Sequence, residues 1–119
     1  MTGTVDTSTT FTDGDVRETI PRFSSDNRAA NQALVEHVAA LGRAKGVSPG
    51  QIALAWLLAQ QPWIVPIPGT RRTSRIQENT GATAVDLSAD EVDDLTTLAE
   101  RMRVHGDRYN ATHMSYVNR

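Results

Sequence analysis

Residues 64–79 read IVPIPGTRRTSRIQEN, and no other part of the chain says as much about its architecture. Apolar residues occupy consecutive positions from Trp63 to Ile67, a pattern typical of a strand that is buried on both faces, as in a parallel sheet. A Gly-Thr turn follows and opens a predicted helix at about 73–82, whose first two turns we expect to carry three arginines. Such a layout favours anion binding, because the first N–H groups of a helix are free and its dipole is positive there.

The helix before this stretch has a complete start signal. Ser48 is the predicted N-cap, Pro49 takes the first helical position, and Gln51 closes a capping box. Residues 52–59 read IALAWLLA and are apolar on every face. We therefore expect this helix to be buried nearly all round.

Two further helices are predicted, one on each side. The first covers about 27–45. Asp26 is its predicted N-cap, and Gly46 is predicted to end it in the left-handed backbone conformation. The second starts at Ser88, the predicted N-cap, with Glu91 closing a second capping box, and its apolar inner face consists of Val92, Leu95, Leu98 and Met102. Residues 1–26 are rich in Thr, Ser, Asp and Gly and read as a loop, and residues 104–119 read as a polar tail.

The expected order is helix, helix, strand, helix, helix. A doubly buried strand needs hydrogen-bonding neighbours for its N–H and C=O groups, and no second strand is predicted in this sequence. We therefore interpret the chain as part of a larger α/β protein whose other strands would flank residues 63–67.

Composition narrows the class of protein. The 119 residues carry a net charge of -2, so neither nucleic acid nor an anionic membrane is an expected partner. There is no cysteine, which suits a cytoplasmic location. The three histidines show no metal-ligand spacing, so we expect no metal site.

Two motifs resemble the aldo/keto reductase family. Residues 48–58, SPGQIALAWLL, resemble its seventh-helix signature, and IPGTRR at 67–72, followed by Arg75-Ile76 and ENTGA at 78–82, resembles its eighth strand and adenosine-phosphate loop. The family fold is a (β/α)₈ TIM barrel with NADP(H) at the carboxyl ends of the strands. The resemblance implies a partial barrel domain over 1–119, divided into a loop (1–26), the last barrel helices and eighth strand (27–82), and a C-terminal helix and tail (83–119).

The resemblance also implies a cofactor site. Gly69 would allow close approach of the backbone, Thr70 and the N–H of Arg71 would contact the 2′-phosphate, and Arg75 would pair with that phosphate or stack on adenine. Glu78 and Asn79 would reach the adenine amino group. From the residues alone, a surface turn followed by a solvated basic helix start is an equal alternative.

Activity is expected only of a complete barrel. The family transfers hydride between NADP(H) and a carbonyl substrate, but its catalytic Asp, Tyr, Lys and His lie on early strands that nothing here matches. We therefore assign no catalytic residue, and we expect a C-terminal fragment or a product started at an internal Met. The alternative is a non-catalytic helical interaction protein or a non-functional remnant, which would self-associate through exposed apolar surface.

Overall fold

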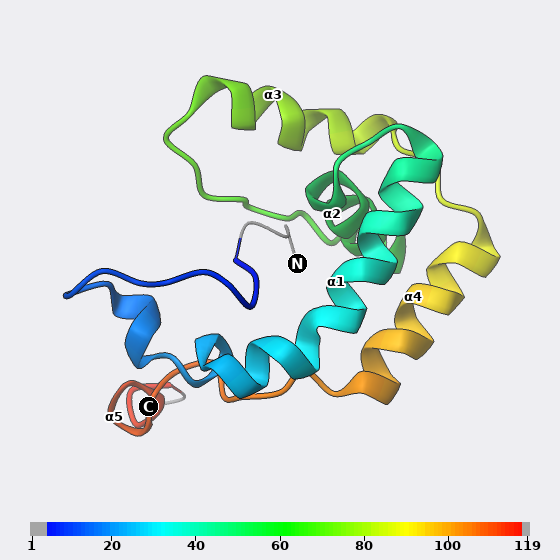
Figure 1. Ribbon diagram of the computed structural model, residues 1–119. Helices are drawn as coiled ribbons and strands as arrows, with labels where there is room; N and C mark the ends of the chain where they lie inside the picture. Colours follow the sequence, from blue (N-terminus) through cyan, green and yellow to red (C-terminus); the bar gives the residue numbers. More distant parts are fainter. Residues whose placement is uncertain (1–4, 118–119) are drawn as a thin grey trace.

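The computed structural model of the protein describes residues 5–117, and within them it is helical with no β-strand. Figure 1 shows α1 packed against α2 and α4, with α3 next to α2 and α5 near the C-terminus. The elements are η1 (Val16–Thr19), η2 (Pro21–Phe23), α1 (Ser25–Lys45), α2 (Pro49–Gln60), α3 (Thr73–Gly81), η3 (Ala82–Ala84), α4 (Ala89–Met102) and α5 (Ala111–Met114).

The core lies where α1, α2 and α4 meet. Leu34 and Val38 of α1, Ile52 of α2 and Leu95 of α4 are buried, and Ile52 has no exposed surface at all. Three of the four residues predicted for the inner face of α4 are confirmed, because Leu95 belongs to this cluster and Leu98 and Met102 pack against it. The remaining partly buried members are Leu41, Val47, Trp56, Val85 and Leu87.

Both predicted capping boxes are confirmed. The Ser48 hydroxyl accepts from the N–H of Gln51 (3.2 Å), whose side chain accepts from the N–H of Ser48 (3.0 Å). Ser88 and Glu91 repeat this arrangement at 3.2 and 2.8 Å. Each pair satisfies two N–H groups that the first helical turn leaves without a partner.

The start of α1 differs from the prediction. Ser24, and not Asp26, is the N-cap, and its side chain accepts from the N–H of Asn27. Asp26 lies inside the first turn, where its charge still matches the helix dipole. At the other end the prediction is confirmed, since Gly46 ends α1 in the left-handed conformation (φ 69°).

The predicted strand at 63–67 was wrong. Residues 64–70 have no regular secondary structure and run as an open stretch between α2 and α3 (Figure 1). A strand exists only when a neighbour pairs with its backbone, and the described residues offer none. The side chains of Trp63, Val65 and Ile67 are 74%, 77% and 94% exposed.

The expected burial of α2 on all sides was also wrong. Only Ile52 and Ala55 are buried. Trp56 packs against the core with its indole N–H donating to the Thr96 hydroxyl (3.0 Å). Leu54 and Leu58, on the far side, line an open cavity together with residues of the segment that follows α2.

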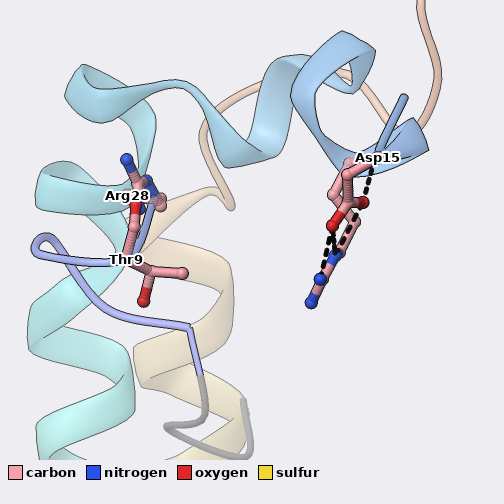
Figure 2. Close-up of polar contacts among 4 residues, drawn as sticks. Thr9, Asp15 and Arg28 are labelled. Carbon is pink, nitrogen blue, oxygen red and sulfur yellow. Dashed lines mark hydrogen bonds and ion pairs between the residues drawn. The ribbon is translucent and has the colours of Figure 1, made fainter. Parts of the chain in front are cut away.

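The N-terminal segment is held onto α1 by a guanidinium group. Nη1 of Arg28 donates to the carbonyl oxygens of Asp6 (2.7 Å) and Thr9 (2.6 Å), and Figure 2 shows this side chain lying against Thr9. Phe11 lies under the guanidinium groups of both Arg28 and Arg17. The part of the predicted loop that the structure describes is therefore ordered by contacts with α1, and it contains η1 and η2.

A second local ion pair fixes the start of η1. Asp15 accepts from the backbone N–H, Nε and Nη2 of Arg17 (Figure 2). Its pKa is lowered to about 2, first by the side-chain hydrogen bonds from Arg17 and then by the backbone N–H. The Arg17 side chain is largely exposed to solvent, so we assign the pair only the local role of capping the N-terminus of η1.

The tail returns to the N-terminal half. The Asn31 side chain donates to the carbonyl of His105 (3.0 Å) and accepts from the N–H of the same residue (2.8 Å). Nε of Arg22 donates to the carbonyl of Gly106 (3.0 Å), and Gly106 has a φ of 86°. A side chain at Gly106 would lie 2.8 Å from backbone atoms of Pro21 and Arg22, so both the conformation and the close approach require glycine.

Candidate functional site

The helix that carries the candidate anion site begins at Thr73, which confirms the predicted start. Arg72 is the N-cap of α3 in an extended conformation (φ -109°, ψ 124°), and the helix starts at Thr73. The expectation that three arginines lie in the first two helical turns was therefore wrong. Arg71 and Arg72 precede the helix, and Arg75 lies within it. Arg71 consequently shares no helical face with Arg75, Glu78 and Asn79.

The N-terminus of α3 has no side-chain cap. Arg75 and Ile76 donate their N–H groups to the Arg72 carbonyl (3.0 and 3.2 Å), whereas no acceptor among residues 5–117 pairs with the N–H groups of Thr73 and Ser74. These two N–H groups, next to the exposed Arg71 and Arg72, remain available to an anion.

The turn before the helix is stabilised by Thr70. Its hydroxyl accepts from the N–H of Arg72 (3.2 Å), which fixes the backbone ahead of the first turn. Gly69, just before it, is exposed, and a Cβ added there would meet nothing within 4 Å. No residue in the described part of the chain crowds Gly69, so open space lies beside this backbone.

Arg75 and Glu78 form an ion pair one turn apart on α3, with Nη1 and Oε2 2.5 Å from each other. Their side chains are 38% and 24% exposed. The pKa of Glu78 lies below its ordinary value of 4.5, first because of the Ser48 hydroxyl and then because of Arg75. Glu78 thus connects Arg75 to the N-cap of α2, which the sequence pattern did not reveal.

A cavity of about 300 Å³ opens beneath the turn. Thr70 and Asn79 both line it, so the structure brings these two predicted residues together. The rest of its wall is mostly apolar and comes from α2, α3, η3 and the segment between α2 and α3: Leu54, Leu58, Val65, Pro66, Pro68, Ile76, Thr80, Ala82 and Thr83. A flat apolar ring with a polar edge would suit this wall.

The candidate site therefore has two parts. Thr70 and Asn79 face the cavity, while Arg75 and Glu78 are paired beside it, and Arg71 is exposed on the turn. Sequence reasoning missed Ser48 as a neighbour of Glu78, although its capping role was clear. Within residues 5–117 no group of three or more potential metal ligands lies together, and none of the helices is long and apolar enough to cross a membrane.

Neutralising Glu78 should destabilise the protein in a pH-dependent way. Its pKa is lower in the folded than in the unfolded chain, so its contribution is present above the unfolded value of 4.5 and is lost as pH falls through the folded-state pKa. We expect Glu78→Gln to lower the free energy of unfolding near pH 7, and the difference from wild type to shrink as pH falls through the folded-state pKa.

Urea unfolding at several pH values measures this difference. Glu100→Gln, at an exposed position of α4, serves as the matched control and should show a much smaller change. A Glu78→Gln deficit that stays constant from pH 7 to pH 3 would show that the carboxylate charge plays no part.

The comparisons with known proteins agree on one family. The family model described as "Aldo/keto reductase family" matches residues 2–100. The chain is 38% identical over 108 residues to "Aldo-keto reductase str7" of Strobilurus tenacellus, covering 91% of this chain and 32% of that protein. It is 38% identical over 109 residues to "Aldo-keto reductase yakc [NADP(+)]" of Schizosaccharomyces pombe, covering 92% of this chain and 32% of that protein.

The match extends over both motifs that carry the resemblance, the SPGQIALAWLL helix and the IPGTRR turn. The chain spans about a third of the length of the curated relatives that it matches. It belongs to the aldo/keto reductase family.

Proposed function

We propose that this chain supplies the adenosine-phosphate end of an NADP(H) site in an aldo/keto reductase. The observation that carries the proposal is the uncapped N-terminus of α3, with free N–H groups beside Arg71 and Arg72 and with Arg75 held one turn away. The S. pombe relative is named as using NADP(+), which supports this choice of cofactor.

The charges fit a 2′-phosphate. The phosphate would accept from the Thr70 hydroxyl, the N–H of Arg71 and the free N–H groups of the first helical turn, and the exposed guanidinium groups would neutralise it. Arg75, 38% exposed, can turn one edge toward the phosphate while the other stays on Glu78. Gly69 leaves room for close approach of the ligand.

Adenine would lie over the mouth of the cavity. Asn79 lines this cavity, so its side-chain amide can meet the polar edge of the ring while Ile76 and Pro68 contact its face. Glu78 is already paired with Arg75, so we assign it first to holding that guanidinium and second to the adenine amino group.

The wider activity follows from the family. We propose that the chain is the C-terminal portion of a (β/α)₈ barrel that transfers hydride between the nicotinamide and a carbonyl substrate, with the catalytic groups on parts of the barrel that lie outside this sequence. NADP(H) is therefore the proposed partner of this chain, and the carbonyl substrate is a partner of the complete barrel. A cytoplasmic location stays a prediction that rests on the absence of cysteine.

A thermal melt with cofactor tests the proposal. A ligand that binds only the folded state stabilises it by RT ln(1 + [L]/Kd), about 2.7 kcal/mol at a hundredfold excess over Kd. Far-UV circular dichroism should show a cooperative transition that moves upward with NADPH and less with NADH. A transition that NADPH leaves unchanged would contradict a cofactor site on this chain.

A further inference from the structure

The start of α2 is in direct contact with α3, the helix that carries the candidate anion site. Ser48 and Gln51 form the capping box of α2, and the Gln51 side chain that closes this box also approaches Gly81 at the end of α3. A Cβ added at Gly81 would lie 2.8 Å from Nε2 of Gln51. The cap of one helix therefore packs on the last turn of the other, and this packing limits how far α3 can rotate about its own axis.

Glu78 lies one turn before Gly81 and contacts the same cap. Its carboxylate accepts a hydrogen bond from the Ser48 hydroxyl. The same carboxylate pairs with Nη1 of Arg75, one turn nearer the start of α3, at 2.5 Å. Glu78 is thus held from two sides, by the cap of α2 and by Arg75, and its side chain is only 24% exposed.

A serine hydroxyl can make both of the contacts that Ser48 makes. Its oxygen accepts from the N–H of Gln51 (3.2 Å), and its hydrogen remains available for donation, because a hydroxyl has one donor and two acceptor lone pairs. Aspartate caps a helix equally well but has no hydrogen to donate, and glycine at an N-cap has no side chain at all. Ser48 is therefore both the N-cap of α2 and a hydrogen-bond donor to Glu78.

We propose that Ser48 is a positioning residue of the cofactor site: it holds the Glu78 carboxylate against α2, and this carboxylate in turn holds the Arg75 guanidinium in place near the start of α3. This role, which rests on the proposed NADP(H) site, makes Ser48 a determinant of the preference for NADPH over NADH. The 2′-phosphate meets a guanidinium that is already ordered, so less side-chain freedom is lost on binding. NADH carries no phosphate at this position and gains nothing from that order.

The second capping box of the chain provides a matched control. Ser88 caps α4 in the same way, but Glu91, which closes that box, pairs with Lys45 of α1. Ser48→Gly and Ser88→Gly each remove one N-cap hydroxyl, which costs a helix little because glycine is tolerated at an N-cap. Only Ser48→Gly also removes the hydrogen bond to Glu78.

Fluorescence titration with NADPH and with NADH tests the role of Ser48. Ser48→Gly should weaken NADPH binding roughly 3- to 10-fold, the effect of losing one hydrogen bond, and leave NADH binding nearly unchanged. Ser48→Thr keeps the hydroxyl and should retain the wild-type preference, as should Ser88→Gly. The ratio of the two affinities separates positioning from folding, because partial unfolding lowers both affinities by the same factor.

A titration without cofactor tests the contact itself. The pKa of the Glu78 carboxyl lies below its ordinary value of 4.5, first because of Ser48 and then because of Arg75. Removing the Ser48 donor should therefore raise this pKa, because the hydrogen bond stabilises the charged form. Carboxyl-carbon NMR over a range of pH should show the rise in Ser48→Gly and not in Ser88→Gly.

The possible outcomes distinguish this role from the cofactor site on which it rests. A wild-type chain that prefers NADPH, with the same preference in Ser48→Gly, would overturn the role of Ser48 and leave the cofactor site intact. Equal losses for both cofactors, or an unchanged pKa of Glu78, would overturn it as well. A wild-type chain that binds neither cofactor would overturn the cofactor site and this role together. Far-UV circular dichroism of each variant checks that the helices are intact.

Discussion

Ile52→Ala is expected to lower the free energy of unfolding by about 2–5 kcal/mol, the largest stability effect that we predict for a single residue. Ile52 has no exposed surface and lies where α1, α2 and α4 meet. It also borders an apolar cavity of about 200 Å³ between these helices, so the deleted methyl groups would enlarge an existing void. The surrounding helices cannot close such a void without breaking their own contacts.

Urea unfolding monitored by circular dichroism at 222 nm measures the effect, because helices give most of the signal. Ile76→Ala is the matched control, since the same atoms are removed from a side chain of α3 that is 54% exposed. Ile76→Ala should lower the free energy of unfolding by less than about 1 kcal/mol. Equal costs for the two variants would show that the three-helix core does not carry the stability of the fold.

Local signals in the sequence were sufficient to predict most of the helices. Each capping box lies within four consecutive residues, so Ser48 and Ser88 could be assigned without any knowledge of the fold. The N-cap of α1 was misplaced because Ser24 and Asp26 are both good caps two residues apart. The left-handed end at Gly46 was predicted for the same local reason.

Non-local features could not be predicted in this way. The pattern at 63–67 describes a strand correctly only if neighbouring strands pair with it, and periodicity contains no information on whether they are present. The burial of α2 failed for the same reason, because Leu54 and Leu58 need a covering layer. In both cases the sequence shows that the side chains are apolar, but it does not show whether other elements pack against them.

For the candidate site, too, local features were predicted and a non-local contact was not. Motif resemblance led to Gly69, Thr70, Arg71, Arg75, Glu78 and Asn79, and the structure places all six around the turn and α3. The start of α3 at Thr73 was predicted correctly, but three arginines were wrongly expected in its first two turns, because two of them precede Thr73. The contact of Glu78 with Ser48 joins positions 30 residues apart, so no spacing within α3 could indicate it.

Arg75→Ala should weaken NADPH binding roughly 10- to 100-fold and leave NADH binding nearly unchanged. A hydrogen bond to a charged group contributes about 1.5–3 kcal/mol, and each 1.4 kcal/mol is a tenfold change in affinity. Only NADPH carries the 2′-phosphate, so the loss should be confined to it. The variant also leaves Glu78 without its arginine, and this carboxylate would then repel the phosphate, which adds to the loss.

Fluorescence titration with each cofactor measures both affinities. Arg101→Ala removes an exposed arginine from α4, away from the turn, and controls for the change in net charge. The double variant Arg75→Ala with Glu78→Gln separates the two contributions: it should recover the repulsive part of the loss and leave the lost phosphate contact. Equal losses for NADPH and NADH in Arg75→Ala would contradict the phosphate assignment and would instead place Arg75 against adenine, which both cofactors share.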